Sequence, residues 1–179
     1  LKETLIRAGI NTDNLIQDEK YFTTLAFVSL KENGEREFAF ARKPGADTNL
    51  CMKEIDPEIL ENTRVFHVGS LSLTDDPSRT ATYEAINIAR NSGAVISYDP
   101  NYRAALWSDP ETAQLRMQSL IPYVDMMKIS DEETSLLTPY QDPEEAIQYL
   151  LRQGVHLVAV TLGRDGALIG NENGIIKAE

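Results

Sequence analysis

The chain is poor in the residues on which disulfide-bonded and zinc-binding proteins depend. Its 179 residues include a single cysteine, Cys51, and two histidines, His67 and His156. One cysteine excludes an internal disulfide and a cysteine-rich zinc site. The chain also has no apolar run long enough to span a bilayer, and it opens without the basic-then-apolar start of a signal peptide. We therefore expect no membrane partner and a reducing, cytoplasmic compartment.

Positive charge is scarce as well. The 17 lysines and arginines are outnumbered by 28 aspartates and glutamates, which gives a formal net charge of −11 at pH 7. An acidic surface repels phosphate backbones, and no dense stripe of Lys and Arg offsets it, so nucleic acid is not expected as a partner. A small anionic ligand is not excluded, because a few arginines and backbone N–H groups can hold one locally.

Two short strand-like runs lie near the start of the chain, at 24–30 and 36–41. They flank the Asn-Gly pair at 33–34, which is the strongest short-range signal for a β-hairpin. In the second run Phe38 and Phe40 alternate with smaller or polar residues, so both belong to one face. A two-stranded ribbon is marginal on its own and is expected to pack against something else.

From residue 64 onward the pattern changes to alternating strands and helices. Near-continuous apolar segments, typical of buried strands, are separated by amphipathic segments, typical of helices. The expected strands are 65–69, 94–98, 124–129 and 156–161, followed by a hairpin of 167–169 and 174–176; the expected helices are 77–91, 110–120, 130–137 and 142–154. This order implies an α/β fold with a mainly parallel sheet and helices on both faces, in which ligands lie beyond the carboxyl ends of the strands.

The strand at 94–98 runs into the sequence Asp-Pro-Asn-Tyr-Arg at 99–103. Proline at position 100 disfavours helix for the residue before it, so the chain leaves the sheet abruptly. The guanidinium of Arg103 is suited to paired hydrogen bonds with a phosphate or with sugar oxygens. The structural alternative is a turn in which Arg103 bridges Asp99 and Trp107.

The next strand ends in Ser-Asp-Glu-Glu at 130–133. Ser130 and Glu133 have the spacing of a capping box, in which each side chain bonds the other residue's backbone N–H. The functional alternative is that Asp131 or Glu133 holds a magnesium ion through water beside a phosphate.

The strand at 156–161 ends in Thr-Leu-Gly-Arg-Asp-Gly at 161–166. Thr161 offers a hydroxyl, and Gly163 lets the backbone approach a ligand closely, which suits phosphate oxygens. The Asp-Gly pair at 165–166 is equally typical of a simple hairpin turn. Elsewhere, Arg42 opens a segment that either contacts a polyol or forms a solvated loop, and His67 is expected to be a core residue.

Taken in order, these segments resemble the PfkB (ribokinase-like) family of carbohydrate kinases over essentially the whole chain. The two most specific runs are Asp-Pro-Asn-Tyr-Arg at 99–103 with Leu-Trp at 106–107, and Thr-Leu-Gly-x-x-Gly at 161–166. The resemblance implies a ribokinase-like parallel α/β core, formed by 1–22 and 42–179, with a small β lid at 23–41. It implies transfer of a phosphoryl group from ATP, with Mg²⁺, to a sugar hydroxyl.

The resemblance also implies roles for individual residues. The nucleotide is expected to be bound by Asn101, Ser130, Thr161, Gly163, Arg164 and Gly166. The sugar is expected to contact Arg42, Tyr102 and Arg103, and Arg103 is expected to stabilise charge on the transferring phosphoryl group. Glu133 is expected to serve the metal. At the position of Ser130, ribokinase-type members of the family have asparagine.

Two motifs of the family are not found in this sequence. They are the N-terminal Gly-Gly substrate motif and the Gly-Ala-Gly-Asp motif that carries the general base. We therefore expect the chain to be an internal part of a longer protein and to have almost no activity alone.

The Arg-x-Pro-Gly-Ala-Asp run at 42–47 favours fructokinase-type members of the family. The alternatives are a kinase of 2-keto-3-deoxygluconate and a non-catalytic sugar-sensing relative. The apolar face of the ribbon predicts a homodimer joined through the lids.

Overall fold

The computed structural model describes residues 1–30, 36–42 and 45–178. The predicted Asn-Gly turn at 33–34 therefore lies outside the described residues. In the described part of the chain, no helix is long and apolar enough to cross a membrane.

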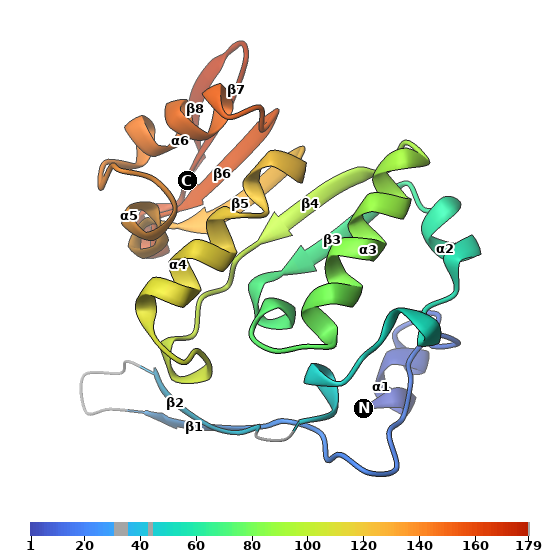
Figure 1. The fold of residues 1–179 in the computed structure, drawn as a ribbon. Helices are drawn as coiled ribbons and strands as arrows, with labels where there is room; N and C mark the ends of the chain where they lie inside the picture. Colours follow the sequence, from blue (N-terminus) through green and yellow to red (C-terminus); the bar gives the residue numbers. More distant parts are fainter. Residues whose placement is uncertain (31–35, 43–44, 179) are drawn as a thin grey trace.

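A six-stranded sheet forms the centre of the fold (Figure 1). Its strands follow chain order: β3 (Val65–Gly69), β4 (Val95–Asp99), β5 (Met126–Ser130), β6 (Leu157–Thr161), β7 (Ala167–Asn171) and β8 (Gly174–Ala178). The pairs from β3 to β6 are parallel, whereas β7 and β8 add to the edge as an antiparallel hairpin. The mainly parallel α/β architecture predicted from the sequence is confirmed.

Three longer helices connect the parallel strands. They are α3 (Ser78–Asn91), α4 (Pro110–Gln118) and α6 (Pro143–Arg152); α1 (Lys2–Arg7), α2 (Pro57–Glu61) and α5 (Thr134–Leu137) are shorter. Asp109 and Asp142 start α4 and α6, because each side chain accepts a backbone N–H of the first turn and proline follows it. Short 3₁₀ segments complete the connections: η1 (Ala46–Thr48), η2 (Met52–Glu54), η3 (Ser70–Leu73), η4 (Ala104–Leu106), η5 (Ile121–Tyr123), η6 (Asp131–Glu133) and η7 (Gly163–Asp165).

The helices α3, α4 and α6 lie on one face of the sheet (Figure 1). Strand side chains on that face form the core, as shown by Ile96 and Tyr98, which are fully buried. On the opposite face the alternate residues are partly or largely exposed, so within the described residues the longer helices cover one face of the sheet and not both faces as predicted. The prediction that His67 is a core residue is wrong, because β3 is an edge strand of the sheet and the His67 side chain is exposed. Its Nδ1 lies 3.0 Å from Oγ of Ser97 on the neighbouring strand.

The predicted ribbon is also confirmed. The strands β1 (Leu25–Leu30) and β2 (Arg36–Ala41) pair antiparallel and form a separate two-stranded sheet (Figure 1). The rings of Phe38 and Phe40 stack nearly parallel, with centroids 6.1 Å apart. Most of the apolar side chains of β1 remain exposed, including Phe27 at 60%.

Candidate active site

The carboxyl ends of the parallel strands meet at one edge of the sheet. The parallel registers place Gly69 beside Asp99 and Ser130 beside Thr161. Lys128 of β5 connects the end of β5 to the end of β4, because its Nζ lies 3.2 Å from Oδ2 of Asp99. The three runs singled out in the sequence therefore begin at neighbouring points of one sheet edge.

Hydrogen bonds hold the turn after β4 in an unusual conformation. Asn101 has a positive φ of 47°, which asparagine adopts more readily than most residues. Its backbone N–H donates to Oδ1 of Asp99 at 3.0 Å. The carbonyl of Pro100 accepts from both the N–H and the hydroxyl of Ser70, a fully buried residue at the end of β3. The turn is therefore fixed from its own strand and from the neighbouring one.

Glu133 links the turn after β4 to the turn after β5. It is only 6% exposed. Its Oε2 accepts from the N–H of Ser130 at 2.8 Å and from the Ser130 hydroxyl at 3.1 Å, which confirms the predicted capping box. Its Oε1 accepts from the N–H of Tyr102 at 2.7 Å, a contact that the capping pattern did not predict.

The negative charge of Glu133 also affects the pKa of the Tyr98 phenol. Burial is the main cause that raises the pKa of Tyr98, and the nearby Glu133 carboxylate raises it further. Tyr98 is therefore neutral and donates its hydroxyl hydrogen to the carbonyl of Met117 at 3.3 Å.

Arg103 is held by contacts other than those considered from the sequence. Its Nη1 donates to the carbonyl of Tyr102 at 2.8 Å, and its Cζ lies 5.6 Å from the centroid of the Phe38 ring. The structural alternative considered above was a turn in which Arg103 bridges Asp99 and Trp107. In the structure, Asp99 pairs with Lys128 instead. The guanidinium thus lies between the sheet edge and the ribbon.

The turn after β6 is a tight backbone loop. The N–H of Leu162 donates to the carbonyl of Gly166 at 2.8 Å, closing a loop in which Gly163 and Gly166 have positive φ values of 59° and 89°. A side chain at position 163 would meet open space, so the positive φ is what favours glycine there. Arg164 is exposed and makes no hydrogen bond or ion pair within the described ranges.

Arg42 is buried at the base of the ribbon, where it is 5% exposed. Its Nε donates to Oδ2 of Asp47 at 2.8 Å, its Nη1 to the Thr74 hydroxyl at 3.0 Å, and its Nη2 to the carbonyl of Leu71 at 2.7 Å. Asp47 in turn accepts from the hydroxyl of Thr24 at 2.6 Å. Nη2 of Arg42 also lies 2.6 Å from Oδ2 of Asp47 in an ion pair, so Arg42 joins the ribbon to η3 and, within the described residues, one of its five N–H donors is left for a ligand.

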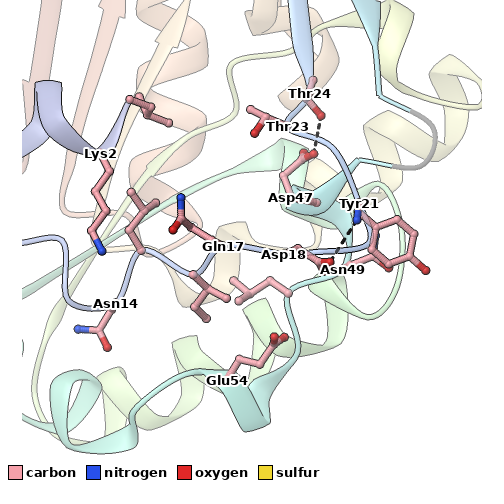
Figure 2. A pocket seen from close by; sticks show the side chains of 15 residues that line it. Lys2, Asn14, Gln17, Asp18, Tyr21, Thr23, Thr24, Asp47, Asn49 and Glu54 are labelled. Carbon is pink, nitrogen blue, oxygen red and sulfur yellow. Dashed lines mark hydrogen bonds between the residues drawn. The ribbon is translucent and has the colours of Figure 1, made fainter.

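Two cavities adjoin this region. One of about 370 Å³ lies between the base of the ribbon and η4 and is lined by Phe22, Phe40, Ala41, Arg42, Ala105 and Leu106. Another of about 800 Å³ lies between residues 1–24 and 46–54 (Figure 2). Figure 2 shows the hydrogen bond from Thr24 to Asp47 at its rim. None of the predicted site residues lines the larger cavity, so we assign the candidate site to the smaller cavity and the adjoining sheet edge.

The described residues contain no group of three or more His, Cys, Asp or Glu side chains that could hold a metal ion. Three of the roughly four acceptor positions of the Glu133 carboxylate are used by protein donors. Within the described residues, one acceptor position of this carboxylate is therefore left without a hydrogen-bond donor.

Sequence reasoning missed three residues that shape the site: Ser70, Phe38 and, as the partner of Arg42, Asp47. A small polar residue directly after a strand was the only available signal for Ser70. The contact of Phe38 with Arg103 joins residues far apart in sequence, and no local pattern indicates it.

Comparisons with known proteins agree with this geometry. The family model for pfkB family carbohydrate kinase matches residues 1–179. The chain is 40% identical over 159 residues to fructokinase-1 of Zea mays, covering 88% of this chain and 49% of that protein.

Two solved structures are similar over 99% of this chain. They are fructokinase from Vibrio cholerae O395 in a fructose, ADP and calcium ion bound form (TM-score 0.88, 33% identity, 57% of that chain) and fructokinase from Xylella fastidiosa with bound ATP (TM-score 0.85, 28% identity, 56% of that chain). The chain spans about half the length of the curated relatives it matches.

Proposed function

Because this chain belongs to the pfkB family of carbohydrate kinases, we propose that the whole protein transfers the γ-phosphoryl group of ATP to a hydroxyl of fructose. The observation that carries the proposal is the meeting of Arg103, the Glu133 turn and the glycine turn after β6 at one sheet edge. The fructokinases to which the chain is similar support fructose as the sugar. The structure of a similar fructokinase with bound ATP supports ATP as the donor.

In this proposal the turn at 161–166 lies against the nucleotide phosphates. Its positive-φ glycines present backbone rather than side chains, which lets phosphate oxygens approach closely. Asn101, Ser130 and the exposed Arg164 border the same nucleotide. Magnesium, which offsets negative charge on the phosphates, would be held by Glu133 through water.

The sugar is proposed to occupy the cavity of about 370 Å³ beside Arg42. The remaining Nη1–H donor of Arg42 and the half-buried Tyr102 are its polar contacts in this proposal. Arg103 stabilises charge on the phosphoryl group during transfer, because a fixed guanidinium needs no reorganisation at that moment. Glu133 and Asp99 are both engaged with donors, so neither is placed to accept the sugar's proton. The family resemblance assigns the general base to the aspartate of a Gly-Ala-Gly-Asp motif, which this sequence lacks, so we propose that another part of the whole protein supplies it.

Substrate competition in the full-length protein tests this function. A coupled assay of ADP release should show a higher kcat/KM for fructose than for 2-keto-3-deoxygluconate. Preference for the keto-acid would reassign Arg42 and Arg103 to carboxylate binding. Turnover of neither sugar would contradict a kinase function and favour a sugar sensor.

We also propose that the protein is a cytoplasmic homodimer joined through the ribbons. Leu25 and Phe27 are 50% and 60% exposed on one face of β1, and burial of such a face against a second copy removes it from water. Replacement Phe27→Asp is expected to shift a dimer to monomer in analytical ultracentrifugation. A wild-type protein that is monomeric at all accessible concentrations would refute the dimer.

A further inference from the structure

A cation–π contact between the ribbon and the candidate site joins Phe38 to Arg103. The guanidinium carbon of Arg103 lies 5.6 Å from the centroid of the Phe38 ring, within the range of a cation–π interaction. Phe38 belongs to β2, whereas Arg103 follows β4 of the large sheet. A side chain of the ribbon therefore contacts Arg103, the residue proposed to stabilise the charge on the transferring phosphoryl group.

We propose that Phe38 is a positioning residue, which holds the guanidinium of Arg103 in the orientation needed for phosphoryl transfer. This inference rests on the proposed kinase function and adds a residue to its machinery.

The Phe38 ring, although 37% exposed, has neighbours within the ribbon. The ring stacks on Phe40 with an interplanar angle of 8°, and Val28 stands opposite it in the register of the ribbon. Phe40 also lines the cavity beside Arg42. The ring that contacts Arg103 therefore stacks on a second ring that lines the cavity, and this stacking connects Arg103 to the cavity wall through the ribbon.

Arg103 has a second anchor on the core side. Its Nη1 donates to the carbonyl of Tyr102, and the N–H of Tyr102 is bonded to the buried Glu133. The core thereby holds one N–H of the guanidinium, while its Cζ lies over the ring of Phe38. Within the described part of the chain, the other four of its five N–H donors make no hydrogen bond and remain for the oxygens of an anion.

The chemistry of this contact preserves the positive charge. The chain has 28 acidic residues, yet within the described residues no carboxylate forms an ion pair with Arg103. A carboxylate partner would neutralise the guanidinium, whereas an aromatic face attracts it without an opposing charge. Phe38 therefore orients Arg103 and leaves its full charge available to phosphate oxygens.

A graded change of the ring in the full-length protein tests the proposal. Fluorinated phenylalanines at position 38 keep the shape of the ring and progressively weaken its attraction for cations. We expect kcat for fructose to fall with each added fluorine and to be roughly 3- to 30-fold lower in Phe38→Leu, with the KM for ATP unchanged. Phe38→Tyr should retain activity. Leu30→Ala, which truncates an exposed apolar side chain of the same ribbon, is the control and should match the wild type.

Each outcome is decisive. A graded fall in kcat, with unfolding temperatures equal to that of the wild type, supports positioning. Equal activity across the fluorinated series, with a loss only in Phe38→Leu, shows that Phe38 acts by packing alone and overturns the proposal. If the wild type does not phosphorylate fructose, the proposed function fails and this inference fails with it.

Discussion

Replacement of Arg103 by methionine in the full-length protein is expected to lower kcat for fructose phosphorylation about 100- to 1,000-fold. Methionine keeps much of the apolar stem but removes the charge that lies between the sheet edge and the ribbon. A preorganised cation acts mainly on charge that develops in the transition state, so kcat should fall more than affinity for ATP.

Steady-state kinetics with fructose and ATP as varied substrates measures this effect. The matched control is Arg7→Met, because Arg7 lies on the surface in an exposed pair with Glu3 and surface pairs contribute little. A kcat for Arg103→Met within threefold of the wild type would remove Arg103 from the reaction. A large loss in Arg7→Met would show that the effect is not specific to the site.

Replacement of Glu133 by glutamine is expected to cost about 3 kcal/mol of the free energy of unfolding as well as most of the activity. The carboxylate accepts three hydrogen bonds while almost fully buried, and the glutamine amide would turn a donor toward at least one of those N–H or O–H groups. Either the N–H of Tyr102 or the N–H of Ser130 then loses its partner, so the link between the turn after β5 and the turn that carries Arg103 loosens.

Denaturant unfolding with and without magnesium separates the two roles considered for Glu133. A positioning role predicts the loss of stability in both conditions, and added magnesium should not restore activity. A role confined to metal binding predicts normal stability without magnesium. The exposed neighbour Glu132, changed to glutamine, provides the control.

Much of the fold was predictable because its signals are local. Apolar segments and the aspartates that start α4 and α6 mark the elements directly, and a parallel sheet brings all its carboxyl ends to one edge. The placement of His67 was wrong for a topological reason. An apolar run indicates a strand, but not that the strand lies at the edge with one face uncovered by the described helices.

The candidate site was predictable as a set of residues but not as a set of contacts. The spacing of Ser130 and Glu133 indicates a capping box, and the structure contains it. The further bond from Tyr102 to Glu133 depends on the adjacency of β4 and β5 and on the positive φ of Asn101, which no spacing reveals. The functional roles of these residues stay predictions.

The central claim is that the ends of β4, β5 and β6 form one phosphoryl-transfer site. The most direct test is a crystal structure of the full-length protein with fructose and a non-hydrolysable ATP analogue. We predict that the nucleotide phosphates lie against the turn at 161–166, that Arg103 contacts the γ-phosphate and that fructose lies beside Arg42. A nucleotide bound away from this edge, with Arg103 directed away from its phosphates, would contradict the claim.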